Sequence, residues 1–411
     1  MKTAMEKLLA LALAATLALS LAACGPKESG DVPTPAPSPS ATQEVRTEVD
    51  FLPDNAIDMA QEVLGFPNTT VLLTVNGKGV TAEEYLYWLG NMTAYYEMMT
   101  MYSGQTLNFD EAIGEDGTTW DKQLKEIAYQ NTLLLAVTPE AAAQRGISLA
   151  DADVAKLIEQ RESNIESAGG EEMYAYQLQA MGINDRTAFE LDKVSTLFGK
   201  VQEAMEAEVT DADVAAYIRE NDLLRCKHIL FKTVDDDRQP LDEATIAQKR
   251  AQAEETMALL REDPTRFDEL MNDRSEDTGL QSAPDGYLFG PGEMVAVFED
   301  TTKSLEVGAI SDIVESEYGY HIILRLDADC AQSREEAASQ VFERVMNEYV
   351  ENAKVEKKAE YDSFTTKEYY EGLTQLQDSL ERPTQVEDMS DATLEPAQTA
   401  QPTETPEPAG D

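Results

Sequence analysis

The sequence contains 411 residues, with 79 acidic and 32 basic side chains and a formal net charge of −47. Such an excess of carboxylates argues against nucleic-acid binding, because phosphate groups require a basic protein surface. The charge fits a well-solvated exported protein or one that attracts basic partners, and we favour the first interpretation.

The N-terminal residues predict export. Lys2 and Lys7 precede an apolar run, 8–21, which has the length of a signal peptide and is short for a transmembrane helix. The run ends in Leu21-Ala22-Ala23-Cys24-Gly25, which resembles the lipobox of bacterial lipoproteins. This resemblance implies a signal peptide over 1–23, a lipid (palmitate) on Cys24 and a location on the extracytoplasmic face of the cell membrane. The alternative is an ordinary secretory signal with an incidental cysteine.

Two segments of biased composition flank the central part of the chain. Residues 24–54 are rich in Pro, Ser and Thr, which predicts a semi-extended tether. Residues 376–411 form an acidic tail, in which 383–411 carry seven carboxylates and no Lys or Arg, so we expect this tail to be disordered. The chain between the two segments is long enough for two domains.

A helical region is predicted over 55–222. Residues 71–80 predict a hairpin that turns at Asn76-Gly77, and Thr81-Ala82-Glu83-Glu84 has the spacing of a capping box ahead of a helix rich in Tyr, Trp and Met. A second helix is expected from Trp120 to Arg145, with a kink or break at Pro139. Further helices are expected at about 149–167, 171–181, 185–207 and 211–220, with Ser148 and Thr210 as N-caps of the first and last of these.

Between residues 223 and 329 the pattern changes to a strand, three helices and two strands. The chain has two histidines, and both lie in strand-like runs, Lys227-His228-Ile229 and Tyr320-His321-Ile322. If the two strands pair with His228 opposite His321, both imidazoles lie on one face of a sheet. Cys226 then lies near residue 323, about 20 Å from Cys330, so we expect no disulfide between them.

After this unit the sequence is helical again over 333–371, within a C-terminal region that we place at 330–375. A lone helix of this kind is too isolated to be stable, so we expect it to pack on the N-terminal helices. The unit at 223–329 is then an insertion in one helical module.

The motifs of the inserted unit resemble those of parvulin-type peptidyl-prolyl cis/trans isomerases. In chain order they are Arg225-Cys226-Lys227-His228-Ile229-Leu230, Phe267-Asp268-Glu269-Leu270, Ser275-Glu276-Asp277, Phe289-Gly290-Pro291-Gly292-Glu293-Met294, Val297-Phe298, Gly308-Ala309-Ile310-Ser311 and Tyr318-Gly319-Tyr320-His321-Ile322-Ile323. The order of lipid anchor, helical region, insertion and returning helix is similar to the PrsA and SurA class of exported foldases. The resemblance implies an α+β fold, in which a small antiparallel sheet with flanking helices is inserted in an all-α chaperone-like module.

The resemblance also implies a slot for the proline ring of a substrate. Met294 and Phe298 match the residues of that slot, and their i, i+4 spacing puts them on one face of an expected helix. Phe289, with Tyr287 or Leu288, would complete the wall. The alternative is that Met294 and Phe298 are ordinary core residues.

Three polar residues match the catalytic positions of the family. His228 and His321 correspond to its histidine pair, and Asp277 stands where members carry either Cys or Asp. The alternatives are that the histidines are structural and that Asp277 caps the following loop. A metal site made of Cys226, His228 and His321 would lack the usual ligand spacing, so we expect neither a metal nor another cofactor.

Two loops depart from the family pattern. Phospho-specific members carry a basic cluster after the first strand, whereas here Lys232 is followed by Asp235, Asp236 and Asp237, which would repel a phosphoserine before proline. Further on, Ala283-Pro284-Asp285-Gly286-Tyr287 replaces the Gly-Gly-Asp-Leu-Gly of many members and alters the rim of the slot.

We therefore expect a membrane-anchored, extracytoplasmic isomerase that acts on X-Pro segments of unfolded or partly folded exported polypeptides, without dependence on phosphorylation. The alternative is a holdase-type chaperone with a weak or inactive parvulin domain, in which the aromatic and Met-rich helix at 85–102 grips unfolded segments. The joint presence of the five matching site residues favours the enzyme.

Overall fold

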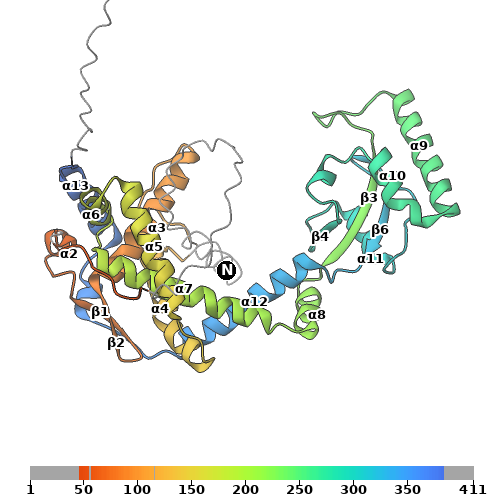
Figure 1. Ribbon diagram of the computed structural model, residues 1–411. Coiled ribbons are helices and arrows are strands. Elements are labelled where there is room, and N and C mark those ends of the chain that lie inside the picture. Colours follow the sequence, from red (N-terminus) through yellow and green to blue (C-terminus); the bar gives the residue numbers. More distant parts are fainter. Residues whose placement is uncertain (1–45, 55–56, 115, 384–411) are drawn as a thin grey trace, which may run out of the picture.

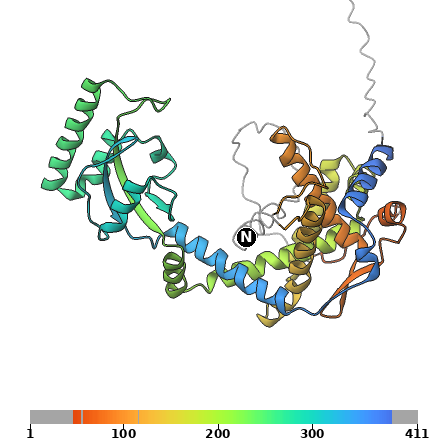
Figure 2. The same ribbon diagram turned by 180° about the vertical axis from the view of Figure 1, so that it is seen from behind.

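The computed structural model describes residues 46–54, 57–114 and 116–383, and within these ranges the protein forms two bodies (Figures 1 and 2). The larger body is mainly helical, and the smaller one surrounds a four-stranded sheet. The expected combination of helices with small antiparallel sheets is confirmed. Across the described part of the chain, no helix has the length and apolar character needed to cross a membrane. Cys24, the signal peptide, most of the predicted tether and most of the predicted tail lie outside the described residues.

The helical body combines two separated parts of the chain. Its helices are α2 (Met59–Leu64), α3 (Ala82–Tyr102), α4 (Trp120–Gln144), α5 (Asp151–Ala168), α6 (Glu171–Ala180), α7 (Asp185–Ala207), α8 (Asp211–Glu220), α12 (Ala331–Asn352) and α13 (Thr366–Ser379), with a short 3-10 turn η3 (Ala359–Asp362). One apolar cluster joins the two parts, with Tyr85 of α3, Phe198 of α7, Phe342 of α12 and Tyr369 of α13 all buried in it. The N-terminal and C-terminal helices therefore share a single core.

A three-stranded sheet lies at one side of this body, in the order β2 (Lys78–Thr81), β1 (Val71–Val75) and β7 (Val355–Lys357). The predicted hairpin of β1 and β2 is confirmed, and Asn76 and Gly77 adopt the positive φ angles, 49° and 80°, that a two-residue turn requires. The expectation of one helix over 333–371 is wrong. α12 ends at Asn352, and β7 then pairs with the open edge of β1, which would otherwise expose unpaired backbone groups.

Two details of the predicted helices also differ. α4 continues through Pro139, so a break of the helix at this residue is wrong. α5 has Ala150 rather than Ser148 at its N-cap, and the carboxylate of Asp153 accepts the Ala150 N–H at 2.8 Å. The capping box of Thr81 and the N-cap at Thr210 are confirmed.

The last residues of the predicted tether contact the helical body. Arg161 and Asp185 form a buried ion pair, with exposed side-chain fractions of 7% and 4%. This pair also bonds the chain ahead of α2, because Arg161 donates to the Asp50 carbonyl and Asp185 accepts the Leu52 N–H. The Phe51 ring lies 5.7 Å from that of Phe189, measured between centroids. Similarly, α13 extends to Ser379, so the first residues of the predicted tail are helical.

The smaller body contains the residues between α8 and α12. Its elements are β3 (Leu224–Lys232), α9 (Glu243–Glu262), η1 (Pro264–Arg266), α10 (Phe267–Arg274), η2 (Thr278–Gln281), β4 (Tyr287–Phe289), α11 (Ala296–Ser304), β5 (Val314–Ser316) and β6 (Gly319–Leu326). The strands form an antiparallel sheet in the order β4-β3-β6-β5, so the first and last strands of the unit lie side by side at its centre. The short strand β4 was not predicted.

The two faces of this sheet bury different side chains. Ile229, Phe231 and Ile322 point to one face, where they pack with residues of α9 and α10 in a purely apolar cluster. Cys226 and Ile323 point to the other face, where they pack with Phe289 and with Phe298 of α11. Because neighbouring side chains of a strand alternate between faces, His228 lies on the face of Cys226. The site residues therefore collect under α11.

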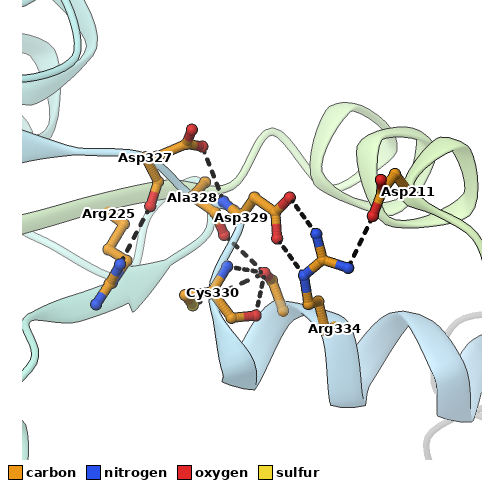
Figure 3. A network of polar contacts seen from close by, with 8 residues as sticks. Asp211, Arg225, Asp327, Ala328, Asp329, Cys330 and Arg334 are labelled. Carbon is orange, nitrogen blue, oxygen red and sulfur yellow. Dashed lines mark hydrogen bonds and ion pairs between the residues drawn. The ribbon is translucent and has the colours of Figure 1, made fainter.

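Polar contacts fix the smaller body to the ends of α8 and α12 (Figure 3). Arg334 of α12 donates to Asp211 of α8 at 2.9 Å and to Asp329 at 2.7 Å. Ser333 donates to the carbonyl of Ala328 at 2.7 Å, and this hydroxyl is buried. Arg225 at the start of β3 donates to the carbonyl of Asp327. The Arg225 bond joins the two crossings of the chain, and the other contacts hold the start of α12 to the chain after β6 and to the start of α8.

We predict that Gly319→Ala destabilises the smaller body by about 3 kcal/mol or more, because overpacking against backbone cannot be relieved by a rotamer change. Gly319 has a φ of 143°, and a Cβ there would lie 2.1 Å from the carbonyl oxygen of Phe231. Hydrogen exchange of the β3 and β6 amides measures this loss.

Gly308→Ala is the matched control, since Gly308 also has a positive φ, 87°, but a Cβ would meet nothing within 4 Å. It should cost only about 1 kcal/mol of backbone strain. Both tryptophans, Trp88 and Trp120, lie in the helical body, so unfolding followed by tryptophan fluorescence should be unchanged in both variants. Equal protection of the β3 amides in the two variants would contradict the prediction.

Candidate functional site

The two histidines lie on adjacent strands but not directly opposite each other. Leu230 is the partner of His321, and Ile323 is the partner of His228, so the expectation of direct opposition is wrong by two residues. An offset of two keeps both side chains on the same face of the sheet. The rings lie diagonally, with centroids 5.3 Å apart and the two Nδ1 atoms 3.3 Å apart. The two rings are therefore in contact, as predicted, but the strand register that brings them together differs from the predicted one.

The histidines belong to a chain of four polar groups. Asp277 Oδ2 lies 3.1 Å from His228 Nε2, and the Ser316 hydroxyl lies 2.6 Å from His321 Nε2. An ionised carboxylate only accepts, so the facing nitrogen of His228 carries a proton. With both rings neutral, one arrangement satisfies every contact: Ser316 donates to His321, His321 Nδ1–H donates to His228, and His228 Nε2–H donates to Asp277.

Asp277 is held by donors from three different segments. Its Oδ2 atom accepts the Tyr287 hydroxyl at 2.6 Å as well as His228, and its Oδ1 atom accepts the Gly279 N–H at 3.0 Å. The last bond caps η2, so the capping role that the sequence left open is present together with the contact to the histidine. One side chain thus joins the loop after α10 to β3 and β4.

Burial and hydrogen bonding fix the charges of the site. Burial, reinforced by the neighbouring His228, lowers the pKa of His321 to about 3. Burial alone would raise the pKa of Asp277, but the hydrogen bonds from His228 and Tyr287 outweigh it and hold that pKa well below its usual range. Burial raises the pKa of the Cys226 thiol to about 12. At neutral pH the site therefore contains a carboxylate, an uncharged His321 and an unreactive thiol.

The predicted slot residues lie beside the histidines. The ring of Phe298 meets His228 and His321 edge-on, with centroid distances of 5.1 and 5.4 Å. Phe289 packs behind it at 6.2 Å, and both phenylalanines are buried, while Met294 is half-buried against the same cluster. Phe298 therefore forms a floor between the rings, and Met294 forms part of its rim.

One expectation about the slot is wrong, and one alternative is decided. α11 begins at Ala296, so Met294 precedes the helix and does not share a helical face with Phe298. In β4, Tyr287 pairs with Cys226 while Leu288 pairs with Arg225, so alternation puts Leu288 on the opposite face from the histidines. Of the two residues offered for the wall, only Tyr287 lies in the site, where its ring centroid is 5.7 Å from that of His228.

Sequence reasoning missed two contributions. Ser316 had no signal, because its bond to His321 depends on the turn between β5 and β6, where the same hydroxyl also accepts the Tyr318 N–H. The hydroxyl of Tyr287 likewise has no signal in the sequence, because its bond to Asp277 joins β4 to a loop ten residues earlier. Among the described residues, no group of three or more His, Cys, Asp or Glu side chains is arranged to hold a metal ion, and Cys226 and Cys330 are both free thiols.

The loop after β3 is acidic and exposed in the structure. Asp235, Asp236 and Asp237 all face solvent, and Arg238 lies over the ring of Tyr318 with its guanidinium carbon 5.7 Å from the centroid. The ammonium of Lys249 is paired with Glu276 rather than free. The loop therefore lacks a cluster of free cations beside the site.

Comparison with known proteins agrees with this geometry. A family model for rotamases, described as the PPIC-type PPIASE domain, matches residues 228–327. The peptidyl-prolyl cis-trans isomerase ESS1 of Saccharomyces cerevisiae is 35% identical over 131 residues, which cover 29% of this chain and 76% of the yeast protein. The foldase protein PrsA of Geobacillus sp. (strain WCH70) is 33% identical over 196 residues, which cover 46% of this chain and 63% of that protein.

Other PrsA proteins match over a similar extent, and the chain spans only about half to three-fifths of the length of these relatives. A crystal structure of PrsA from Bacillus subtilis aligns with 69% of this chain and 98% of its own, at 20% identity and a TM-score of 0.23. That score is too low for any conclusion about a shared overall arrangement.

The match to the isomerase family model, and to 76% of the yeast isomerase at 35% identity, defines the class of protein. The chain belongs to the parvulin-type, or PPIC-type, family of peptidyl-prolyl cis-trans isomerases. Within that family it is similar to the PrsA foldases, whose sequences it matches beyond the isomerase unit.

We predict that His321 stays neutral at pH 5, although an ordinary imidazole with a pKa of about 6.5 is mostly charged there. Its folded-state pKa of about 3 lies below the unfolded value. The ring therefore contributes full stability above about pH 6.5, and this contribution is lost as the pH falls toward 3, by up to about 1.4 kcal/mol per pH unit.

Nitrogen-15 NMR of the histidine-labelled full chain measures the charge directly, because the chain contains two histidines. A His228→Gln variant assigns the two signals. The same chain unfolded in urea provides the control, in which both rings should be charged at pH 5. An imidazolium signal from His321 in the folded chain at that pH would refute the prediction.

Proposed function

We propose that this protein is a lipid-anchored, extracytoplasmic peptidyl-prolyl cis/trans isomerase that assists the folding of exported proteins, with residues 223–329 as its isomerase domain. The observation that carries the proposal is the polar chain of His228, His321 and Asp277 beside the buried ring of Phe298. In this proposal Phe298 and Met294 contact the proline ring, and Phe289 supports Phe298 from behind.

The physical task is rotation about an X-Pro amide, whose barrier of about 20 kcal/mol comes from amide resonance. No covalent bond has to form. A twisted amide carries less negative charge on its carbonyl oxygen than a planar one, so a fixed carboxylate near that oxygen favours the twisted form. Asp277 supplies such a charge, and an apolar surface under the proline ring excludes water, which would screen it. The two rings act mainly as the framework that fixes Asp277.

Three features support the proposed location and clients of the protein. The lipobox-like sequence that ends at Cys24 and the apolar run before it support export and lipid attachment. The similarity to proteins named foldases supports unfolded or partly folded polypeptides as substrates. The acidic, exposed loop at Asp235–Asp237 supports substrates without a phosphoserine, since a phosphate would be repelled there.

We expect the full chain to accelerate cis/trans exchange in a short X-Pro peptide, measured by NMR exchange spectroscopy. Phe298→Ala and His321→Ala should each reduce kcat/KM at least about tenfold, which corresponds to about 1.4 kcal/mol of lost transition-state stabilisation. Val307→Ala serves as the control, because this residue of the same unit is 61% exposed, and it should keep the wild-type rate.

A peptide with phosphoserine before proline should be a poorer substrate than its unphosphorylated counterpart. If the full chain gives only the uncatalysed exchange rate with every peptide, the isomerase proposal fails and the holdase alternative takes its place.

One observation favours the holdase as a second function. The first half of α3 is core, with Tyr85 and Trp88 buried, but its last turns expose Met98, Met99, Met101 and Tyr102, with exposed fractions from 46% to 82%. Single exposed apolar side chains are common, whereas four on one helix end are typical of an interaction surface. Methionine suits varied partners because its side chain is flexible and polarisable.

We predict that the full chain suppresses aggregation of an unfolded client, followed by light scattering, and that Met101→Lys combined with Tyr102→Lys weakens this suppression several-fold by placing charge on the surface. Isomerase activity should be unaffected. Ile57→Lys, at an apolar residue that is 37% exposed elsewhere on the helical body, is the matched control. If the double variant and the control suppress aggregation equally, the exposed end of α3 is not the surface that binds the client.

A further inference from the structure

The backbone conformation at Gly286, just before β4, determines where the side chain of Tyr287 lies. Gly286 has a φ of 100°, and a Cβ there would lie 2.7 Å from the carbonyl oxygen of Cys226. No side chain fits at this position without a shift of the β3 backbone. The next residue, Tyr287, pairs with Cys226, so its side chain lies on the face of the histidines. The loop therefore presents a phenol to the site immediately after a position that admits no side chain.

The phenol does more than line the slot. Its hydroxyl donates to Asp277 Oδ2 at 2.6 Å, a length typical of a hydroxyl bonded to a carboxylate. The same oxygen is 3.1 Å from His228 Nε2, so the two donors share one acceptor atom. Burial, together with the bond to Asp277, raises the pKa of Tyr287. The phenol therefore keeps its proton at neutral pH and remains a donor.

Two other donors also bond the carboxylate, one at each oxygen. Gly279 N–H bonds Oδ1 from within the same loop, and His228 bonds Oδ2 over a longer distance. Tyr287 comes from β4, on the other side of β3 from β6. Its short bond ties the loop that carries Asp277 to the sheet independently of the histidine.

We propose that Tyr287 is a positioning residue of the isomerase. Its hydroxyl acts through Asp277, because it holds the carboxylate in the orientation that favours the twisted amide. The ring of Tyr287 lines the slot separately from this role. The inference rests on the proposed isomerase function and names a determinant of its rate that the proline slot alone does not supply.

Two substitutions separate the hydroxyl from the ring. Tyr287→Phe keeps the ring and removes the donor, so kcat should fall by about tenfold to a hundredfold, as for a misplaced catalytic group, while KM changes little. Tyr287→Ala removes both, so KM should rise as well. If Tyr287→Phe raises KM and leaves kcat unchanged, the residue is only part of the slot wall and the proposal is overturned.

A spectroscopic readout tests the shared acceptor in the full, histidine-labelled chain. Two donors on one oxygen weaken each other, so removing the phenol should strengthen the His228 bond and move its Nε2-bound proton downfield. The matched control is Tyr370→Phe, because the Tyr370 hydroxyl also donates to a carboxylate, Glu97 Oε2, at 2.7 Å in the helical body. This control should alter neither the kinetics nor the His228 resonance.

The experiments still test the proposal if one variant does not fold or if the wild-type chain has no isomerase activity. Tyr287→Met fills similar space without a donor and replaces Tyr287→Phe if the latter does not fold. A wild-type chain without catalysis refutes the proposed function. The change in chemical shift of the Nε2-bound proton of His228 still tests whether His228 and Tyr287 share one acceptor. An unchanged His228 resonance in a folded Tyr287→Phe chain overturns the inference, whatever the activity.

Discussion

The offset antiparallel pairing of β3 with β6 determines where every group of the site lies. It places His228 and His321 diagonally on one face, within reach of each other, while Ile229 and Ile322 anchor the opposite face under α9 and α10. A slip of either strand by one residue would turn the histidine of that strand into the apolar cluster, so burial on two faces specifies the register strongly. The close approach of Gly319 to β3, which excludes any side chain, adds a steric constraint at the end of the same pair.

The same burial explains the distribution of charge. His321 is uncharged because its surroundings solvate an imidazolium poorly, whereas Asp277 is charged because three donors compensate for its partial burial. The result is a single fixed negative charge next to an apolar floor at Phe298. An enzyme that only needs to favour a twisted amide requires this kind of preorganised field and no nucleophile, which agrees with the inert thiol of Cys226.

Sequence reasoning succeeded where the determinants are local and failed where they are distant. Asn76-Gly77 and the capping box of Thr81 depend on a few neighbouring residues, and both were predicted. The register of β3 and β6 and the pairing of β7 with β1 depend on strands far apart in the chain, which no short pattern reveals. A break at Pro139 is not found, because α4 is packed into the helical core on both sides of this residue, with Val137 and Ala141 both buried. At the site, the residue types were predictable, but the bond from Tyr287 to Asp277 required the course of β4.

The central claim is that the two imidazole rings form one directed chain of hydrogen bonds that ends on Asp277. A nitrogen–nitrogen scalar coupling across the hydrogen bond, measured in the histidine-labelled full chain at neutral pH, tests it most directly. The account predicts a coupling between the two Nδ1 atoms, which lie 3.3 Å apart, with the bridging proton on His321 and a second proton on His228 Nε2. A spectrum in which His228 carries its only proton on Nδ1 would contradict the account.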